Sequence, residues 1–187
     1  MAQKRKDWNG LISGFKVSDL VFLDESGCNT NMTRRYAYSL GGSRAVDSAP
    51  LSKPKNTTIL SSIQLDGTLH YTTFSGGTTV ERFKQYLETD LLPHLNGDSV
   101  LVMDNMKSHH AKAVKNLLDS SGVRYIYLPP YSPDLNPIEK LWSKVKSILR
   151  KFKARTLDAL PNAIQNAFHS VTASDCSGWF RFCGYAL

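Results

Sequence analysis

Short apolar runs recur along the chain, and most of them end at a glycine, an aspartate or an asparagine. Runs of this length that are rich in apolar and β-branched residues predict strands. The predicted strands are Leu20–Leu23, Arg35–Leu40, Thr57–Leu65, Leu69–Phe74, Ser99–Met103 and Val123–Leu128. Asp66 and Gly67 stand between the third and fourth runs, and an Asp-Gly pair in that place predicts a β-hairpin.

Longer stretches place apolar residues three or four positions apart, which is typical of helices with one buried face. The predicted helices are Thr78–Leu92, Ala111–Leu118, a long helix that begins near Asn136, Thr156–Ser170 and, approximately, Ser174–Cys183. Strands with a hairpin therefore come first, and helices then alternate with single strands. This order predicts an α/β fold in which helices pack on a mixed sheet.

The long helix separates its residue types by side when it is drawn at about 100° per residue. Its apolar residues share one arc, which we expect to face the core: Ile138, Leu141, Trp142, Val145, Ile148, Leu149 and Phe152. Glu139, Lys146 and Arg150 fall together on another side. One acid and two bases therefore share a flank of this helix.

Composition fits one globular domain. The 187 residues are 41% hydrophobic and 21% charged, which is ordinary for such a domain. No apolar run approaches the ~20 residues of a membrane-spanning helix. The polar, basic residues Met1–Gly10 lack the apolar part of a secretory signal. We therefore expect a cytoplasmic protein with no membrane partner.

The net charge of +7 and the pI of about 9.3 favour a polyanionic partner. The three cysteines are Cys28, Cys176 and Cys183, and they form no CxxC pair. No histidine lies at a spacing from them that is typical of zinc ligands. Free thiols in a reducing compartment are the simplest interpretation.

Three acidic residues lie at the ends of predicted elements. Asp24 and Asp104 are each the first charged residue after an apolar strand, and Glu139 lies in the first turn of the long helix. Ligands of α/β sheets bind outside the carboxyl ends of the strands. Clustered carboxylates repel one another, and a divalent cation such as Mg²⁺ removes this cost. A basic protein with such a cluster is a candidate for a Mg²⁺-dependent nuclease.

Each acid also has a local structural interpretation. An aspartate at the end of a strand is commonly a turn residue or a helix cap. Asn136, Pro137 and Glu139 have the spacing of an N-cap, a proline at the first helical position and a capping-box acid. Asp134 is most simply a turn residue, and Glu25 should point away from its acidic neighbour because successive side chains of a strand alternate. Local patterns alone leave both interpretations open.

Three stretches, VFLDESG, LVMDN and YLPPYSPDLNPIEKLW, occur in this order along the chain. Together they resemble the DDE transposases of bacterial insertion sequences related to the mariner elements. Thirty-four residues separate Asp104 from Glu139, which is the interval typical of the second and third acids of that superfamily. The segments DESGCNTNMTRRYAYSLGGSR and DCSGWFRFCGY are also similar to family segments, so the resemblance covers nearly the whole chain.

The resemblance implies a ribonuclease-H-like fold, with Asp24 on the first strand, Asp104 after the fourth strand and Glu139 on a following helix. These acids would be both the catalytic residues and the ligands of two Mg²⁺ ions, for which Mn²⁺ could substitute. The implied reaction is hydrolysis at the ends of a transposon, followed by attack of the freed 3′-hydroxyl on target DNA. The implied partners are both DNAs and further copies of the chain, in a bacterial cytosol or nucleoid.

Other residues would support this site. Asn105 and His109 match family positions after the second acid, whereas His110 stands where a lysine is usual. His109 would either orient a phosphate or cap the next helix. The basic residues of the long helix form either a solvated face or a track for DNA phosphates. We expect a DNA track that includes Lys140, Lys144, Lys146, Arg150 and Lys151.

Members of this superfamily usually carry a helix-turn-helix region before the catalytic domain, and about nineteen residues precede the first predicted strand here. We expect residues 1–19 to be a short basic linker remnant and residues 20–187 to be the catalytic domain. The helix-turn-helix region would be absent or on a separate polypeptide. Two other interpretations are a nucleic-acid-binding remnant that does not cut and a ribonuclease-H-like nuclease with no role in transposition. The presence of all three acids favours the transposase.

Overall fold

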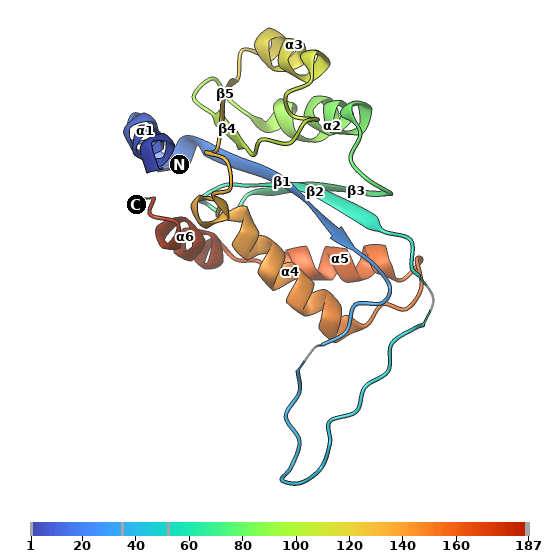
Figure 1. Cartoon of the computed structure of the whole chain (residues 1–187). Coiled ribbons are helices and arrows are strands. Elements are labelled where there is room, and N and C mark those ends of the chain that lie inside the picture. The colour runs from blue at the N-terminus through green and yellow to red at the C-terminus, as the bar shows by residue number, and fades with distance from the viewer. Residues whose placement is uncertain (1, 35, 52, 186–187) are drawn as a thin grey trace.

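A computed structural model of the chain describes residues 2–34, 36–51 and 53–185. Its centre is a five-stranded sheet with the order β3-β2-β1-β4-β5 (Figure 1). The strands are β1 (Leu20–Cys28), β2 (Thr57–Ile63), β3 (Leu69–Ser75), β4 (Val100–Met103) and β5 (Arg124–Tyr127). β1, β2 and β3 pair in antiparallel fashion, β4 runs parallel to β1, and β5 runs parallel to β4. The predicted mixed sheet is therefore confirmed.

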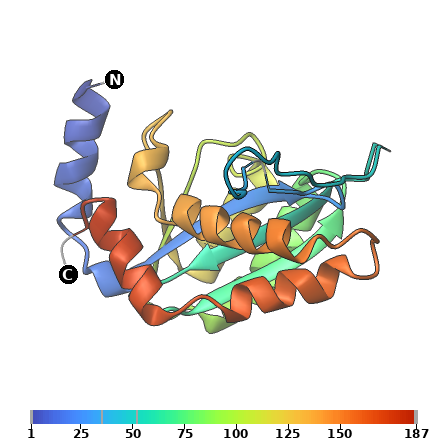
Figure 2. The same cartoon turned by 90° about the horizontal axis from the view of Figure 1, so that it is seen from below.

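Helices cover both faces of this sheet (Figures 1 and 2). On one face lie α2 (Val80–Tyr86), its π-helical continuation η2 (Leu87–Leu91), the 3-10 turn η3 (Leu92–His94) and α3 (Lys112–Ser121). On the other face lie α4 (Ile138–Phe152), α5 (Leu160–His169) and α6 (Ala173–Phe182). Two further 3-10 turns are η1 (Val17–Asp19) before β1 and η4 (Pro133–Leu135) before α4.

The alternation of side chains along β1 produces the two layers. Leu20 and Phe22 pack into the core beneath α4, α5 and α6, whereas Val21 and Leu23 pack into the core beneath α2 and α3. Successive side chains of a strand point to opposite faces, so one continuous apolar run supplies both cores. The central strand is thereby fixed in the sheet, together with the acids that follow it.

β1 continues beyond its apolar part, which corrects the prediction that the strand ends at Leu23. Residues 24–28 pair with β2, so their backbone has partners although several of their side chains are polar. β4, by contrast, ends at Met103. The parallel register places Leu23 beside Met103, so Asp24 and Asp104 follow at the same level of two adjacent strands.

The hairpin predicted between β2 and β3 is confirmed. The backbone N–H of Gln64 donates to the carbonyl of Thr68, and the turn contains Asp66 and Gly67. Gly67 has a φ of +94°, a left-handed conformation that glycine adopts without the strain of a side chain. The Asp-Gly pair therefore sets this connection as expected.

The predicted strand Arg35–Leu40 is wrong for the residues that can be described. Arg35 lies outside the described residues, and residues 36–40 have no strand structure. The described residues between β1 and β2 form a long excursion that leaves the body of the molecule (Figure 1). Tyr38 is fully exposed there. The apolar content of this stretch suggested a strand, but no described strand pairs with residues 36–40 and all five are exposed.

The core face predicted for α4 is correct except in the last turn. The buried members are Ile138, Leu141, Trp142, Val145 and Leu149, and Ile148 is partly buried. Phe152 is 56% exposed, because the helix ends there and the chain leaves through Lys153 in a left-handed conformation. α5 also begins later than predicted, at Leu160, after a bend and turn over residues 156–159.

The first nineteen residues, which we expected to be a linker remnant, contain the helix α1 (Ala2–Ile12). Trp8 is 3% exposed and belongs to the core beneath α4, α5 and α6. Arg5 forms an ion pair with Asp134, in the segment before α4. Figure 2 shows α1 beside α6. The helix is thus packed against the domain.

The three cysteines form no disulfide within the described residues, as the sequence suggested. All three cysteines are buried and free within the described residues, and burial raises the pKa of each thiol to about 11. Thiols of this kind are poor nucleophiles and metal ligands at neutral pH. None of the described helices combines the length and apolar character that crossing a membrane requires.

Candidate active site

A cavity of about 410 Å³ lies beside the end of β4 and is lined by all three acids predicted from the sequence, Asp24, Asp104 and Glu139. Its other walls are Asn105, Met106, Asn136 and residues 128–133. No lysine, arginine or histidine is among the described residues that line it. Three distant parts of the chain therefore bring carboxylates to one cavity whose lining holds no cationic side chain.

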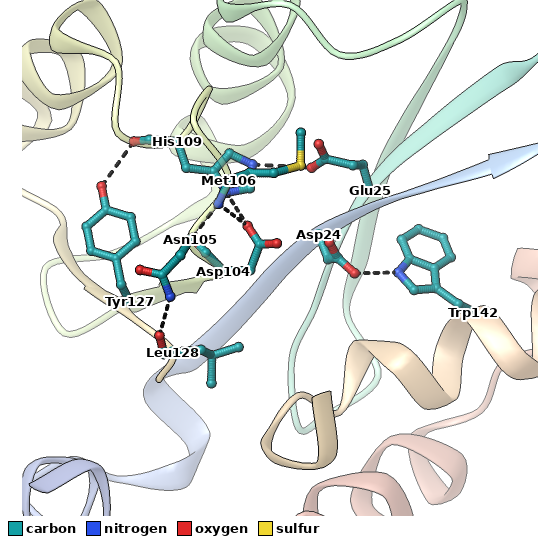
Figure 3. Close-up of polar contacts among 9 residues, drawn as sticks. All are labelled: Asp24, Glu25, Asp104, Asn105, Met106, His109, Tyr127, Leu128 and Trp142. Carbon is teal, nitrogen blue, oxygen red and sulfur yellow. Dashed lines mark hydrogen bonds and ion pairs between the residues drawn. The ribbon is translucent and has the colours of Figure 1, made fainter. Parts of the chain in front are cut away.

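Asp24 is the most enclosed of the three acids. It lies within β1 and is 9% exposed, and Trp142 Nε1 of α4 donates a hydrogen bond to its Oδ2 over 3.0 Å (Figure 3). Burial raises the pKa of Asp24 to about 7, and the charges of Asp104 and Glu25 add to this, although the Trp142 hydrogen bond acts in the opposite direction. A nearby cation would strongly favour its charged form.

Asp104 directly follows β4, and its two oxygens have different surroundings. Oδ1 lies 2.8 Å from His109 Nδ1 and accepts a hydrogen bond from the Met106 backbone N–H over 2.9 Å. Among the described residues Oδ2 has no hydrogen-bond partner. Burial alone would raise the pKa of Asp104, but the hydrogen bonds from His109 and Met106 hold it below its usual value. Asp104 is thus a charged acid with one oxygen held and one free.

Glu139 is an exposed residue in the first turn of α4, and the predicted capping box does not form. The N-cap is Pro137, and no side chain caps this end. Asn136 instead ends the preceding turn η4. Its side chain is buried, and its Oδ1 has no partner among the described residues. The Glu139 carboxylate also has no partner there, so it is free to reorient.

The three acids have the donor chemistry of a divalent-cation site but not its spacing. Mg²⁺ and Mn²⁺ are bound in proteins mainly by carboxylate and other oxygens. In the part of the chain that the structure describes, no three His, Cys, Asp or Glu side chains are close enough to hold an ion together. Carboxylates without a cation between them repel one another, and Glu139 is the member that is free to move.

Two residues behind Asp104 have roles that the sequence did not suggest. His109 is fully buried, and it neither borders the cavity nor caps α3, whose N-cap is Ala111. Its Nε2 lies 3.2 Å from Oε2 of Glu25 (Figure 3). Burial alone would lower the pKa of His109, but its contacts with Asp104 and Glu25 raise it to about 9. Glu25 lies in β1 directly after Asp24. Nothing in the sequence indicates that it contacts a histidine 84 residues away.

Asn105 acts on the backbone around the cavity. Its Nδ2 donates to the carbonyl of Leu128 over 2.5 Å, which ties the end of β4 to the end of β5. The backbone N–H of Leu128 in turn donates to the carbonyl of Met103 over 2.8 Å. The supporting role expected for Asn105 is thus a structural one in this geometry.

The five basic residues expected to form a DNA track on α4 fall into two groups. Lys144 forms an ion pair with Asp175 of α6 at 2.5 Å, and Lys140 Nζ lies 3.7 Å from the centre of the Phe182 ring. Both side chains are therefore engaged with α6. The members with no hydrogen-bond or ion-pair partner among the described residues are Lys146, Arg150 and Lys151.

The segment between β5 and α4 forms one wall of the cavity and is held at several points. Arg5 of α1 pairs with Asp134, and the Tyr185 hydroxyl donates to the carbonyl of Leu135 over 2.6 Å. Tyr131 is exposed and has a φ of +55°, which is uncommon for a residue with a side chain. These contacts and the four prolines between Pro129 and Pro137 make this wall of the cavity rigid.

A known protein family covers most of the chain. Residues 19–161 match the family described as DDE superfamily endonuclease. The Tc1 transposable element transposase of Caenorhabditis elegans is 29% identical over 97 residues, which are 50% of this chain and 36% of that protein. The chain thus spans only part of this relative.

Solved structures of Mos1 complexes have the same fold. A pre-cleavage Mos1 transpososome matches with a TM-score of 0.80 and 19% identity, over 97% of this chain and 58% of the other. The Mos1 mariner paired end complex with Mn matches with a TM-score of 0.78 and 21% identity, over 95% of this chain and 57% of the other. The ribonuclease-H-like fold predicted from the sequence is therefore confirmed, whereas the bacterial origin stays a prediction.

Proposed function

The chain belongs to the DDE superfamily of endonucleases, and we propose that it is the catalytic domain of a DNA transposase. In this proposal it cleaves at transposon ends and joins the freed 3′-hydroxyl to target DNA. The observation that carries the proposal is the single cavity lined by Asp24, Asp104 and Glu139. These acids come from β1, from the end of β4 and from α4, which are far apart in the sequence.

We assign the three acids as the ligands of Mg²⁺, with Mn²⁺ as a substitute. The free Oδ2 of Asp104 and the enclosed carboxylate of Asp24 lie at the same level of neighbouring strands, which are ~5 Å apart in a sheet. Glu139 would complete the set from α4. Divalent cations, when bound, would lower the charge of the phosphate and activate the attacking oxygen. The Mos1 complex with Mn supports this assignment.

The work of the protein itself would be positioning. Backbone pairing fixes the chain at Asp24 and directly before Asp104, and Trp142 fixes the rotamer of Asp24 through its indole N–H. A phosphodiester in the cavity would lie between these carboxylates and Glu139. Reactions of this kind depend mainly on geometry and charge neutralisation, so the loss of one acid should reduce the rate by orders of magnitude.

DNA is the proposed partner, and α4 would carry part of its path. Lys146 and Arg150 follow Glu139 at about two and three helical turns, and they have no partner among the described residues. Contacts of this type hold phosphates without reading sequence. The similar Mos1 structures are a transpososome and a paired end complex, so we propose that further copies of the chain assemble on DNA.

Cleavage of labelled duplex DNA that carries the terminal repeats of the source element tests the proposal. The chain should cut in Mg²⁺ or Mn²⁺ and not in EDTA, and Asp104→Asn should abolish the cut. Asp158→Asn is the matched control, because Asp158 is an exposed acid outside the cavity. Cleavage that persists in Asp104→Asn would refute the site assignment.

The same labelled duplex separates the two other functions when a gel shift is run and a second DNA is supplied as a target for joining. A nucleic-acid-binding remnant would bind the duplex in a gel shift but would not cut it, with or without a divalent metal. A nuclease with no role in transposition would hydrolyse the duplex, but it would not join a 3′-end to a second DNA. The cavity with all three acids present favours the transposase over the remnant.

A further inference from the structure

Three side chains form a connected series that runs from behind the sheet to the cavity (Figure 3). Oε2 of Glu25 lies 3.2 Å from His109 Nε2, and His109 Nδ1 lies 2.8 Å from Oδ1 of Asp104. Only Asp104 of the three borders the cavity. The series therefore ends at one oxygen of a proposed cation ligand and leaves the other oxygen free.

The histidine is fixed from every side that the structure describes. It is fully buried, and its ring stacks on Phe83 of α2 with 4.3 Å between the ring centres. Its backbone carbonyl accepts a hydrogen bond from the Tyr127 hydroxyl over 3.0 Å. With both ring nitrogens engaged and one face covered, the ring has little freedom to turn.

The burial of the Glu25 carboxylate costs folding free energy. Its side chain is 11% exposed, and its Oε1 is buried without a hydrogen-bond partner among the described residues. Burying a carboxylate is costly unless it is paired. His109 is the partner that the structure provides, so Glu25 is held for its contact with that ring.

We propose that Glu25 and His109 are positioning residues that orient Asp104 for cation binding, an inference that rests on the function proposed above. Glu25 fixes the ring, the ring holds Oδ1, and Oδ2 is thereby directed to the cavity. Groups behind the ligands of a metal site commonly act in this way, and their loss weakens metal binding by about 10–100-fold. A purely structural buried pair would instead affect folding stability alone.

Two substitutions of His109 separate the two contacts. In His109→Asn the side-chain amide can occupy the place of Nδ1 and keep the contact with Asp104, whereas in His109→Gln it can occupy the place of Nε2 and keep only the contact with Glu25. Glu25→Gln keeps the shape of the acid and removes its charge. His169→Gln is the control, because His169 is exposed at the end of α5.

The measurement is Mn²⁺ affinity of the purified chain by electron paramagnetic resonance, alongside thermal unfolding without metal. We expect His109→Gln to weaken Mn²⁺ binding by about 10–100-fold, Glu25→Gln to weaken it less, and His109→Asn to stay within a few-fold of the wild type. Unchanged affinity in both His109→Gln and Glu25→Gln would overturn the inference, whatever the change in melting temperature. If His109→Gln does not fold, the result for Glu25→Gln decides.

Failure of the proposed function has a different signature. Asp104→Asn should itself weaken Mn²⁺ binding, and if it does not, the cation site is wrong and this inference falls with it. Binding that depends on Asp104 but not on Glu25 or His109 would leave the proposed function in place. It would remove only the positioning role.

Discussion

At the scale of single residues, the fold holds Asp24 in a place that costs stability. The residue is 9% exposed, its carboxylate accepts a hydrogen bond from the indole of Trp142, and burial raises its pKa to about 7. A core residue of this size would normally be apolar. Its retention is explained by the cavity that it lines rather than by packing.

The raised pKa of Asp24 gives a prediction about stability and pH. The folded state binds a proton up to about pH 7, whereas the unfolded chain releases it near the ordinary value of 3.8. Between these two values the folded state holds more protons, so its stability falls as the pH rises. Asp24→Asn removes this loss. In EDTA, urea unfolding should show Asp24→Asn to be more stable than the wild type at pH 8, by a margin that shrinks at pH 5.

Asp158→Asn is the control for this titration, because it removes an exposed acid outside the cavity. Its effect should vary less between the two pH values than that of Asp24→Asn. Equal margins for Asp24→Asn at pH 5 and pH 8 would show that the buried carboxylate is not the cause.

Residues differ in how far the sequence alone could place them. Asp104 and Glu139 lie in short segments with distinctive neighbours and a fixed interval, so their sequence context is enough to single them out. Glu25 could not be found in this way, because its role depends on a contact with His109 across 84 positions. The alternation of side chains along a strand correctly predicted that Glu25 points away from Asp24. It did not predict which residue Glu25 contacts.

At the scale of elements, the site depends on two strands of unequal length. β4 ends at Met103, whereas β1 continues as far as Cys28 because β2 supplies its backbone partners. From the sequence alone, the polar residues after Leu23 suggest that the strand ends there. The pairing of residues 24–28 with β2, which extends the strand, is visible only in the structure. The sequence could still place each aspartate directly after an apolar run, and the structure adds the parallel register that aligns the ends of these two runs.

The junction between α4 and α6 gives a second prediction. Asp175 completes a capping box with Thr172 at the start of α6, and it also forms the ion pair with Lys144 of α4. Asp175→Ala removes both contacts and should lower the free energy of unfolding by about 1–2 kcal/mol. Lys144→Ala removes only the ion pair and should have a smaller effect. Equal losses in urea unfolding would mean that the cap contributes nothing.

The basic flank of α4 gives a third prediction, which concerns DNA. The double variant Lys146→Ala with Arg150→Ala should flatten the dependence of DNA affinity on salt, by about 0.9 in the logarithmic slope for each lost phosphate contact. The reason is that both side chains lack protein partners among the described residues. Filter binding of a labelled duplex at several salt concentrations measures the slope.

A control with the same change in charge comes from the opposite face of the sheet. Lys112→Ala with Lys115→Ala removes two charges from α3, which lies across the sheet from α4 (Figure 1). If both double variants change the slope equally, net charge is responsible and α4 carries no track.

At the scale of the whole molecule, a mixed sheet with helices packed on it could be predicted from the sequence, because most apolar runs had the length and period of their element. The order of the strands and the division of the helices between the two faces came from the structure. The long excursion after β1 could not be predicted from the sequence, because its apolar residues suggest a strand. In the described fold no neighbouring strand pairs with it. Tertiary context decides such cases, because strand preference reflects packing and neighbouring strands more than the backbone itself.

The attachment of α1 to the domain gives the last prediction. Trp8 is 3% exposed in the core beneath α4, α5 and α6, so truncating its side chain removes a large buried apolar surface. Trp8→Ala should lower the free energy of unfolding by about 3 kcal/mol or more, as expected for a large cavity. Leu11→Ala on the same helix should cost much less, because Leu11 is 47% exposed. If α1 were a loosely attached segment, both variants would unfold in urea at the wild-type midpoint. Trypsin would then cleave at Lys4, Arg5 and Lys6 equally fast in all three proteins, whereas a packed α1 should become sensitive only in Trp8→Ala.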